Sequence, residues 1–326
     1  MYSLFARSGT LNYLALIPLF VILRLRLIVE PSFYVLADTS DQYTPLWNAL
    51  LGHVDAGGYL WVFLGIAIPL LTSLIVSNIS NRYFNDHETT ALGAMFFLLF
   101  CGILRPSVCF HPAMIEAVLL AMSVDRMFSA VRKERSSVSI AWSFVYATLG
   151  ALLWAKAVWF LPFLVIMMFV VRVGNGRTLT AAFLGMADVT LLTYTCGLVA
   201  GWHPVDCIVE WHKRIWATAP FWSTGWRSWT YLAILALTTF GAIMQTFPRN
   251  AGQTIVTYRQ CRVAYWFIIV GVFLMVLPTF SYETQEIAAI GAALLLPQFF
   301  ANMRSKAWQD GLTAVIFLVQ VWLVWS

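Results

Sequence analysis

The sequence predicts an all-α protein, a polytopic integral membrane helical bundle of about eleven transmembrane helices. Hydrophobic residues make up 60% of the 326 residues and charged residues 11%, whereas a soluble domain carries roughly 25% charged residues. Apolar runs recur along the chain with lengths near the ~20 residues that cross a ~30 Å hydrocarbon core. Since no segment is both polar and long enough to fold alone, we expect a single membrane domain over residues 1–326.

The predicted spans follow the apolar runs in chain order. The first run has no A-x-A-like cleavage site after it, so we expect it to be retained as a helix. Several runs are short, and residues 138–172 could form one hairpin that is broken at Trp154–Ala157. The predicted spans are 9–29, 57–78, 89–104, 112–130, 138–154, 157–172, 179–201, 229–247, 263–280, 287–302 and 311–325.

The distribution of Lys and Arg predicts the orientation of the bundle. With the N-terminus inside, thirteen of the 20 Lys and Arg fall in inward loops and seven in outward ones. Basic loops favour the cytoplasmic side of a membrane, so the chain is expected to be N-in and C-out. The net charge of +5 has the same origin, and no basic, aromatic-interleaved polar segment indicates a nucleic-acid surface.

Two outward loops are long, at residues 30–56 and 202–228. Both contain short apolar stretches, of which Pro45–Leu51 is one. Such segments usually lie in the membrane interface as amphipathic helices, and we expect one in each loop.

Asp38 and Asp41 are three residues apart in the first of these loops. If this turn is helical, the two carboxylates share a face. They could bind a divalent cation, or one of them could act as a general base. The alternative is a solvated loop whose polar residues cap the next helix.

A second polar group lies in the other loop, at a spacing that forms one stripe on a helix. Its residues could ligate a metal, but the spacing is looser than that of a typical zinc site, and none of the five Cys forms a CxxC pair. The alternative is an interfacial helix anchored by Trp202, Trp211 and Trp216. The stripe consists of His203, Asp206, Cys207 and Glu210.

Asp188 lies near the middle of the predicted span 179–201. An ionised carboxylate there costs at least ~2.5 kcal/mol, so an acid inside the membrane is a candidate functional residue. It could relay protons or bind a cation, or it could be a hydrogen-bonded packing residue with Thr190 or Thr193 as its partner. His111 and Glu116 flank the start of the fourth span.

Four cations fall near the outer leaflet, against the positive-inside trend: Arg24, Arg26, Arg105 and Lys156. Either they bind a phosphate or diphosphate group, which Arg can grip with two hydrogen bonds, or they extend to the interface without a ligand. We expect the second arrangement for Arg24 and Arg26. Lys156 stands alone in the tight turn Leu153–Val158 and is a stronger candidate for phosphate binding.

The stretch from Leu104 to Val171 resembles part of the GT-C superfamily, the multi-span glycosyltransferases that use polyprenyl-phosphate sugar donors. The similar features are an acidic residue in the loop after the first helix, a Pro-containing turn at Pro106–Pro112, and a Gly-rich helix that leads into a Lys-containing hairpin at Gly150–Lys156. The whole chain also resembles an uncharacterised family of polytopic bacterial inner-membrane proteins. The acids are split as Asp38–Asp41, whereas many GT-C members have an adjacent acidic pair.

The resemblance implies a GT-C-like N-terminal module and a transferase that acts on a lipid-linked sugar at the outer face of the bacterial inner membrane. Asp38 or Asp41 would be the catalytic base or a metal ligand. Arg105 and Lys156 would bind the departing lipid phosphate. On the acceptor side, the candidate residues are His203, Asp206 and Glu210.

Two other function classes remain open at this point. A transporter or flippase would use Asp188 as its coupling site, and a non-catalytic subunit of an envelope complex would expose an apolar flank to membrane protein partners. The sequence indicates no cofactor with certainty, although the paired acids could hold a divalent cation. The expected partners are the lipid bilayer and a polyprenyl-phosphate-linked substrate, and no nucleic acid is expected.

Overall fold

The computed structural model describes residues 2–6, 9–30, 44–51, 58–84, 90–101, 110–131, 136–216, 225–249, 255–277, 284–303 and 305–325. All of its regular elements over these residues are helices, and every predicted span falls on one or two of them. Six helices are long and apolar enough to cross a membrane by themselves. The chain is therefore a multi-pass, all-α membrane protein, whereas the number of eleven spans and the N-in, C-out orientation remain predictions.

The described chain divides into two compact units. Unit 1 contains residues 1–35, 56–111 and 220–326, and unit 2 contains residues 36–55 and 112–219. Both units are helical and both contain candidate spans, so the single membrane domain expected from the sequence stays a prediction.

Unit 1 is built around helix α15 (Gln285–Ala301), whose residues 285–298 are all buried. Helices α5, α6, α13 and α14 pack against it. The other helices of the unit are α1, α2, α3 and α16, of which α1 and α2 have only four and five residues. The bounds in unit 1 are α1 Tyr2–Phe5, α2 Thr10–Leu14, α3 Leu16–Val29, α5 Tyr59–Tyr83, α6 Leu92–Phe100, α13 Trp226–Arg249, α14 Ile255–Val276 and α16 Lys306–Trp325.

Small residues allow α15 to be enclosed. A Cβ on Gly291 would lie 3.0 Å from the Ala264 carbonyl oxygen of α14, and a Cβ on Gly271 would lie 2.9 Å from the Ala288 backbone of α15. Helices in a membrane associate through van der Waals contact, and glycine and alanine let their backbones approach closely.

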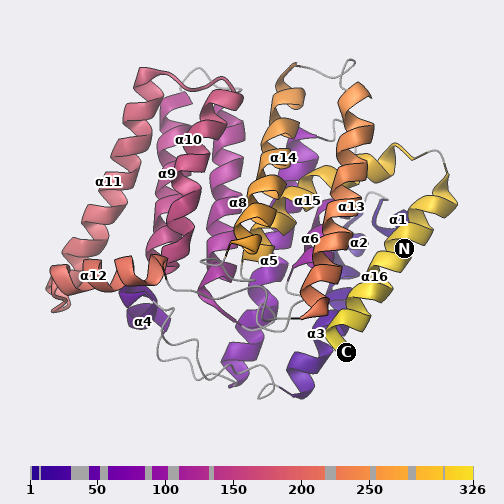
Figure 1. Ribbon diagram of the computed structural model, residues 1–326, viewed down its shortest axis with the longest axis horizontal. Helices are drawn as coiled ribbons and strands as arrows, with labels where there is room; N and C mark the ends of the chain where they lie inside the picture. Colours follow the sequence, from indigo (N-terminus) through magenta and orange to yellow (C-terminus); the bar gives the residue numbers. More distant parts are fainter. Residues whose placement is uncertain are drawn as a thin grey trace. The chain divides into compact units, whose positions relative to one another are not determined.

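Unit 2 is a row of helices with α9 (Ser136–Leu153) at its centre, between α8 (Pro112–Val131) and α11 (Gly176–Val199). After α9 come the 3₁₀ turn η3 (Ala155–Trp159) and α10 (Phe160–Val170). Figure 1 shows α8 to α11 running alongside one another. The predicted break at Trp154–Ala157 is therefore present, because α9 ends at Leu153 and η3 begins two residues later.

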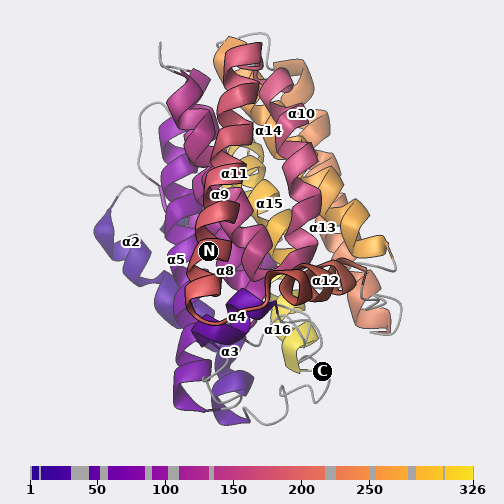
Figure 2. The same ribbon diagram turned by 90° about the vertical axis from the view of Figure 1, so that its left-hand side faces the viewer.

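Two short helices lie across one end of this row. They are α4 (Pro45–Leu51) and α12 (Pro204–Ile215), which contact each other at the foot of α11 (Figure 2). α4 coincides with the apolar stretch that the sequence singled out. α12 begins with Pro204 at its first turn, a position where proline loses no helical hydrogen bond. The two long loops thus contain the expected helices, and their location in the membrane interface stays a prediction.

Candidate functional site

The site in unit 2 is the corner where α9 passes into η3. We define the α9–η3 corner as residues 150–156 together with Thr44 and Trp211. Lys156 lies in the first turn of η3, and its side chain is 2% exposed. The Trp154 amide donates to the Gly150 carbonyl at 2.8 Å, and the Ala157 amide donates to the Trp154 carbonyl at 2.9 Å. These bonds fix the backbone on both sides of the lysine.

Side chains from the two crossing helices hold the end of α9. The last four carbonyls of an α-helix have no partner within the helix. Here the Trp211 Nε1 of α12 donates to the Ala151 carbonyl at 3.0 Å, and the Thr44 hydroxyl donates to the Leu153 carbonyl at 2.9 Å. Thr44 also accepts from the Trp47 amide at 3.2 Å, which fastens the start of α4 to the same corner.

A buried carboxyl group lies under the corner. Glu116, in the second turn of α8, is 0% exposed, and its two oxygens have no hydrogen-bond partner among the described residues. A Cβ at position 150 would collide with this carboxyl group. The absence of a side chain at Gly150 therefore leaves the space that the Glu116 carboxyl group occupies between α8 and α9. Two turns further along the same contact, the Ser143 hydroxyl donates to the Ser123 carbonyl at 2.9 Å. The α8–α9 interface is therefore polar at two depths.

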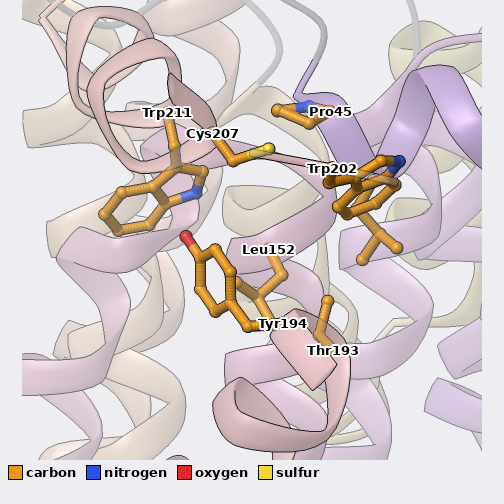
Figure 3. A pocket seen from close by; sticks show the side chains of 8 residues that line it. Pro45, Leu152, Thr193, Tyr194, Trp202, Cys207 and Trp211 are labelled. Carbon is orange, nitrogen blue, oxygen red and sulfur yellow. The ribbon is translucent and has the colours of Figure 1, made fainter. Parts of the chain in front are cut away.

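A small cavity of about 20 Å³ lies next to the corner, between α4, the end of α9, α11 and α12. This is enough space for roughly one water molecule. Figure 3 shows that the Tyr194 hydroxyl is directed toward the Trp211 ring, with the Cys207 thiol on the α12 side. The cavity lining combines aromatic rings with a few polar atoms, and its residues are Pro45, Leu46, Leu152, Thr193, Tyr194, Trp202, Cys207 and Trp211.

The polar stripe of α12 separates into two faces. Cys207 lines the cavity, whereas His203, Asp206 and Glu210 are exposed. Glu210 accepts a hydrogen bond from Arg214 at 2.6 Å. Burial, and then the charges of Glu210 and Asp206, raise the pKa of the Cys207 thiol, which favours the protonated form. In the described part of the chain, no group of three or more His, Cys, Asp or Glu is arranged to hold a metal ion.

The other sequence candidates are distributed as follows. Asp188 is exposed on α11 and does not line the cavity beside the corner. The Thr190 hydroxyl, considered as its partner, donates to the Met186 carbonyl at 2.8 Å instead. Asp38, Asp41 and Arg105 lie outside the described residues, so their roles stay predictions.

Unit 1 contains a second buried polar group, around the first turn of α15. The Phe100 carbonyl accepts from the Tyr231 hydroxyl and from the Gln285 side-chain amide, each at 3.0 Å. The His111 Nε2 lies 3.7 Å from a carboxylate oxygen of Glu286, which is 1% exposed. Glu286 directly precedes the predicted span 287–302. It belongs to the helix, where a carboxylate in the first turn is favoured by the helix dipole.

Arg24 corrects one expectation. We expected it to extend from the end of the first helix to the interface, but its side chain is 1% exposed. The guanidinium lies 5.1 Å from the centre of the Phe20 ring, and both Arg24 and Glu286 act electrostatically on Cys101. Arg24 is therefore part of the buried polar group of unit 1. Arg26 differs, since it donates to the Trp325 carbonyl at 3.0 Å in an exposed contact.

No family model matches this chain, and no curated protein matches it. Among solved structures, it is similar to ArnT from Cupriavidus metallidurans bound to undecaprenyl phosphate, with a TM-score of 0.56 and 12% sequence identity over 84% of this chain. The chain shares its fold with ArnT. ArnT is a GT-C glycosyltransferase, so the GT-C resemblance expected from the sequence is confirmed at the level of fold. The match covers 53% of ArnT, so this chain spans about half the length of that protein.

Proposed function

We propose that this chain is a GT-C-like glycosyltransferase that takes a sugar from a polyprenyl-phosphate carrier at the outer face of the bacterial inner membrane. The observation that carries the proposal is the buried Lys156, which follows a helix end that is held by hydrogen bonds from other elements. The chain that contains this lysine shares its fold with ArnT. The structure of ArnT contains undecaprenyl phosphate, and we extend this ligand class to the present chain.

The chemistry of the α9–η3 corner suits a phosphate monoester or diester. An ammonium group that is removed from water favours an anionic ligand, since charge-assisted hydrogen bonds are stronger where the local dielectric constant is low. Trp211 and Thr44 fix the backbone around Lys156, so the cation would meet the ligand without reorganisation of the helix end. Arg105 would supply a second, bidentate contact to the same phosphate.

In the proposed reaction, a hydroxyl oxygen of the acceptor attacks the anomeric carbon of the sugar. The bond from this carbon to the phosphate oxygen breaks, the lipid phosphate leaves with the bonding electrons, and Asp38 or Asp41 takes the hydroxyl proton. Lys156 and Arg105 stabilise the charge that develops on the leaving phosphate. In the sequence, Asp41 is three residues from Thr44, which is hydrogen-bonded to the corner.

The test uses the purified full chain in lipid nanodiscs with undecaprenyl phosphate as the probe, and native mass spectrometry as the readout. We expect Lys156→Met to weaken binding by about tenfold or more, because one charge-assisted contact is lost. Lys213→Met removes an exposed lysine from α12 and is the matched control, with unchanged binding expected. Lys156→Arg keeps the charge and should retain most of the affinity.

Catalysis is tested separately from binding. Asp38→Asn and Asp41→Asn should leave undecaprenyl phosphate binding intact, and one of them should lower transfer of a labelled sugar from an undecaprenyl-phosphate donor by about 10²–10⁴-fold. Equal transfer by the wild type and by both variants would remove the acids from the mechanism. Equal lipid binding by Lys156→Met and the wild type, with both proteins folded, would remove the phosphate site from the corner.

A further inference from the structure

Helix α11 is the least enclosed of the six candidate spans. Only 17% of its apolar window is buried, against 28–56% for the other five. Its covered side packs on α9, where a Cβ on Gly185 would lie 2.6 Å from the Ala141 carbonyl oxygen. The opposite side of α11 is left uncovered by the residues that the structure describes.

The uncovered side has a regular pattern. Leu184, Leu191 and Leu198 recur at every seventh residue and are 65%, 68% and 54% exposed. Ala181, Asp188 and Thr195 lie between them at alternating steps of three and four. This heptad spacing is the one with which two helices pack side by side. We call these six residues the α11 seam.

Asp188 is at the centre of the α11 seam and at the middle of the 24-residue helix. Its side chain is exposed, and it has neither a hydrogen bond nor an ion pair with any residue that the structure describes. The Thr195 hydroxyl, two turns further along the seam, donates to the Leu191 carbonyl at 2.6 Å. Lipid tails offer no hydrogen-bond donor, so a carboxyl group at this depth needs a donor from elsewhere.

We propose that the α11 seam docks a transmembrane helix of a partner protein that carries a basic side chain at its centre. The leucines supply the packing surface and Asp188 supplies the charge that selects the partner and its register, as single polar residues do in helix pairs. A second copy of the chain fits less well, because a two-fold contact along the seam would bring two Asp188 carboxylates together. This proposal is independent of the transferase activity.

The test uses synthetic leucine-rich transmembrane peptides of one length with Lys, Leu or Glu at the central position. Energy transfer between a labelled peptide and the labelled full chain in liposomes gives the association constant. We expect the Lys peptide to bind the wild type about tenfold or more tightly than the Leu peptide does. Asp188→Leu should abolish the difference, and Asp188→Lys should reverse it, so that the Glu peptide binds best.

A relocated charge is the matched control. The double variant Asp188→Leu with Phe183→Asp keeps the acid on α11 but moves it off the seam, and it should not restore selective binding. Both positions are exposed, so the thermal unfolding midpoint should stay near that of the wild type. Equal binding of the Lys and Leu peptides by the wild type would overturn the proposal. Energy transfer between two labelled copies of the chain that is lost in Asp188→Leu would overturn it in favour of self-association.

Discussion

Helices α15 and α11 are both apolar enough to be predicted as spans, yet they have opposite environments. α15 is buried along residues 285–298, whereas the described residues cover α11 on one side only. The difference lies in the small residues: α15 has Gly291 and several alanines where α14 approaches, whereas α11 presents large side chains such as Phe183 and Leu191 outward. Hydropathy thus predicts that a helix enters the membrane, and residue size predicts what surrounds it.

The acids of the two helices follow the same division. Glu286 of α15 is enclosed near His111 and Arg24, and Asp188 of α11 is exposed. In unit 1 the protein itself supplies the polar surroundings of the acid. In unit 2 those of Asp188 must come from outside the described chain. Four substitutions, given in order of decreasing expected effect, test how the two units hold their helices and polar groups.

The largest effect is expected for Glu286→Leu. Removing one member of a buried polar pair leaves the other without compensation, which costs about 3–5 kcal/mol of unfolding free energy. Denaturation in detergent micelles with a fluorescence readout measures the loss. Glu286→Gln keeps the shape and much of the hydrogen bonding, so its loss should be smaller. If Glu286→Leu is as stable as the wild type, the buried polar group of unit 1 does not hold α15 in place.

The next effect concerns the close contact of α14 and α15. Gly291→Leu forces a side chain against the Ala264 carbonyl and the Ile268 backbone, and such overpacking costs about 1–3 kcal/mol or more. The control is Gly311→Leu on α16, where a Cβ would meet nothing within 4 Å. The same unfolding measurement should separate the two variants. A similar loss in both would show that close approach does not distinguish α15.

A smaller effect is expected at the α9–η3 corner. Trp211→Phe keeps a ring but removes the hydrogen bond to the Ala151 carbonyl, which is worth about 1 kcal/mol. Hydrogen exchange should show faster opening of the Trp154–Phe160 amides, and undecaprenyl phosphate affinity should fall less than in Lys156→Met. Val205→Ala is the control on the same helix, because Val205 is 71% exposed. Exchange that is unchanged in Trp211→Phe would mean that α12 does not hold the corner.

The smallest effect on stability is expected for Asp188→Leu. The side chain is exposed, so the unfolding free energy should change by less than about 0.5 kcal/mol. A larger loss would mean that Asp188 has a structural partner within the chain, and the contrast between α15 and α11 would then fail. The measurement is the same denaturation curve, run beside Glu286→Leu.

Much of the fold could be predicted from the sequence because its signals are local. Apolar length gave the positions of the helices, and the polar turn Trp154–Ala157 gave the break after α9. The stretch Pro45–Leu51 was expected to be helical and is α4. Helix ends shifted where polar residues continue a helix, as at Gln285 and Glu286, since hydropathy alone assigns such residues to loops.

The environment of individual side chains could not be predicted, because it depends on contacts between distant segments. Arg24 is buried with groups that follow it by more than 75 residues in the sequence, so its position at a helix end suggested an exposed cation. Glu116 was noted only as a flanking acid, although Gly150 on α9 leaves space for its carboxyl group. The four polar residues of α12 have the spacing that places them on one stripe of a helix. With Trp211 bonded to α9, however, Cys207 lines the cavity and the other three residues are exposed.

The most direct test of a phosphate site at the α9–η3 corner is a cryo-electron microscopy structure of the full chain in a nanodisc with undecaprenyl phosphate. The decisive quantity is the distance from the Lys156 Nζ to the nearest phosphate oxygen. We predict about 2.7–3.0 Å, the length of a charge-assisted hydrogen bond, with Asp38 or Asp41 on the side from which the acceptor approaches the sugar. A phosphate bound away from the α9–η3 corner, with Lys156 contacted by protein atoms alone, would contradict this prediction.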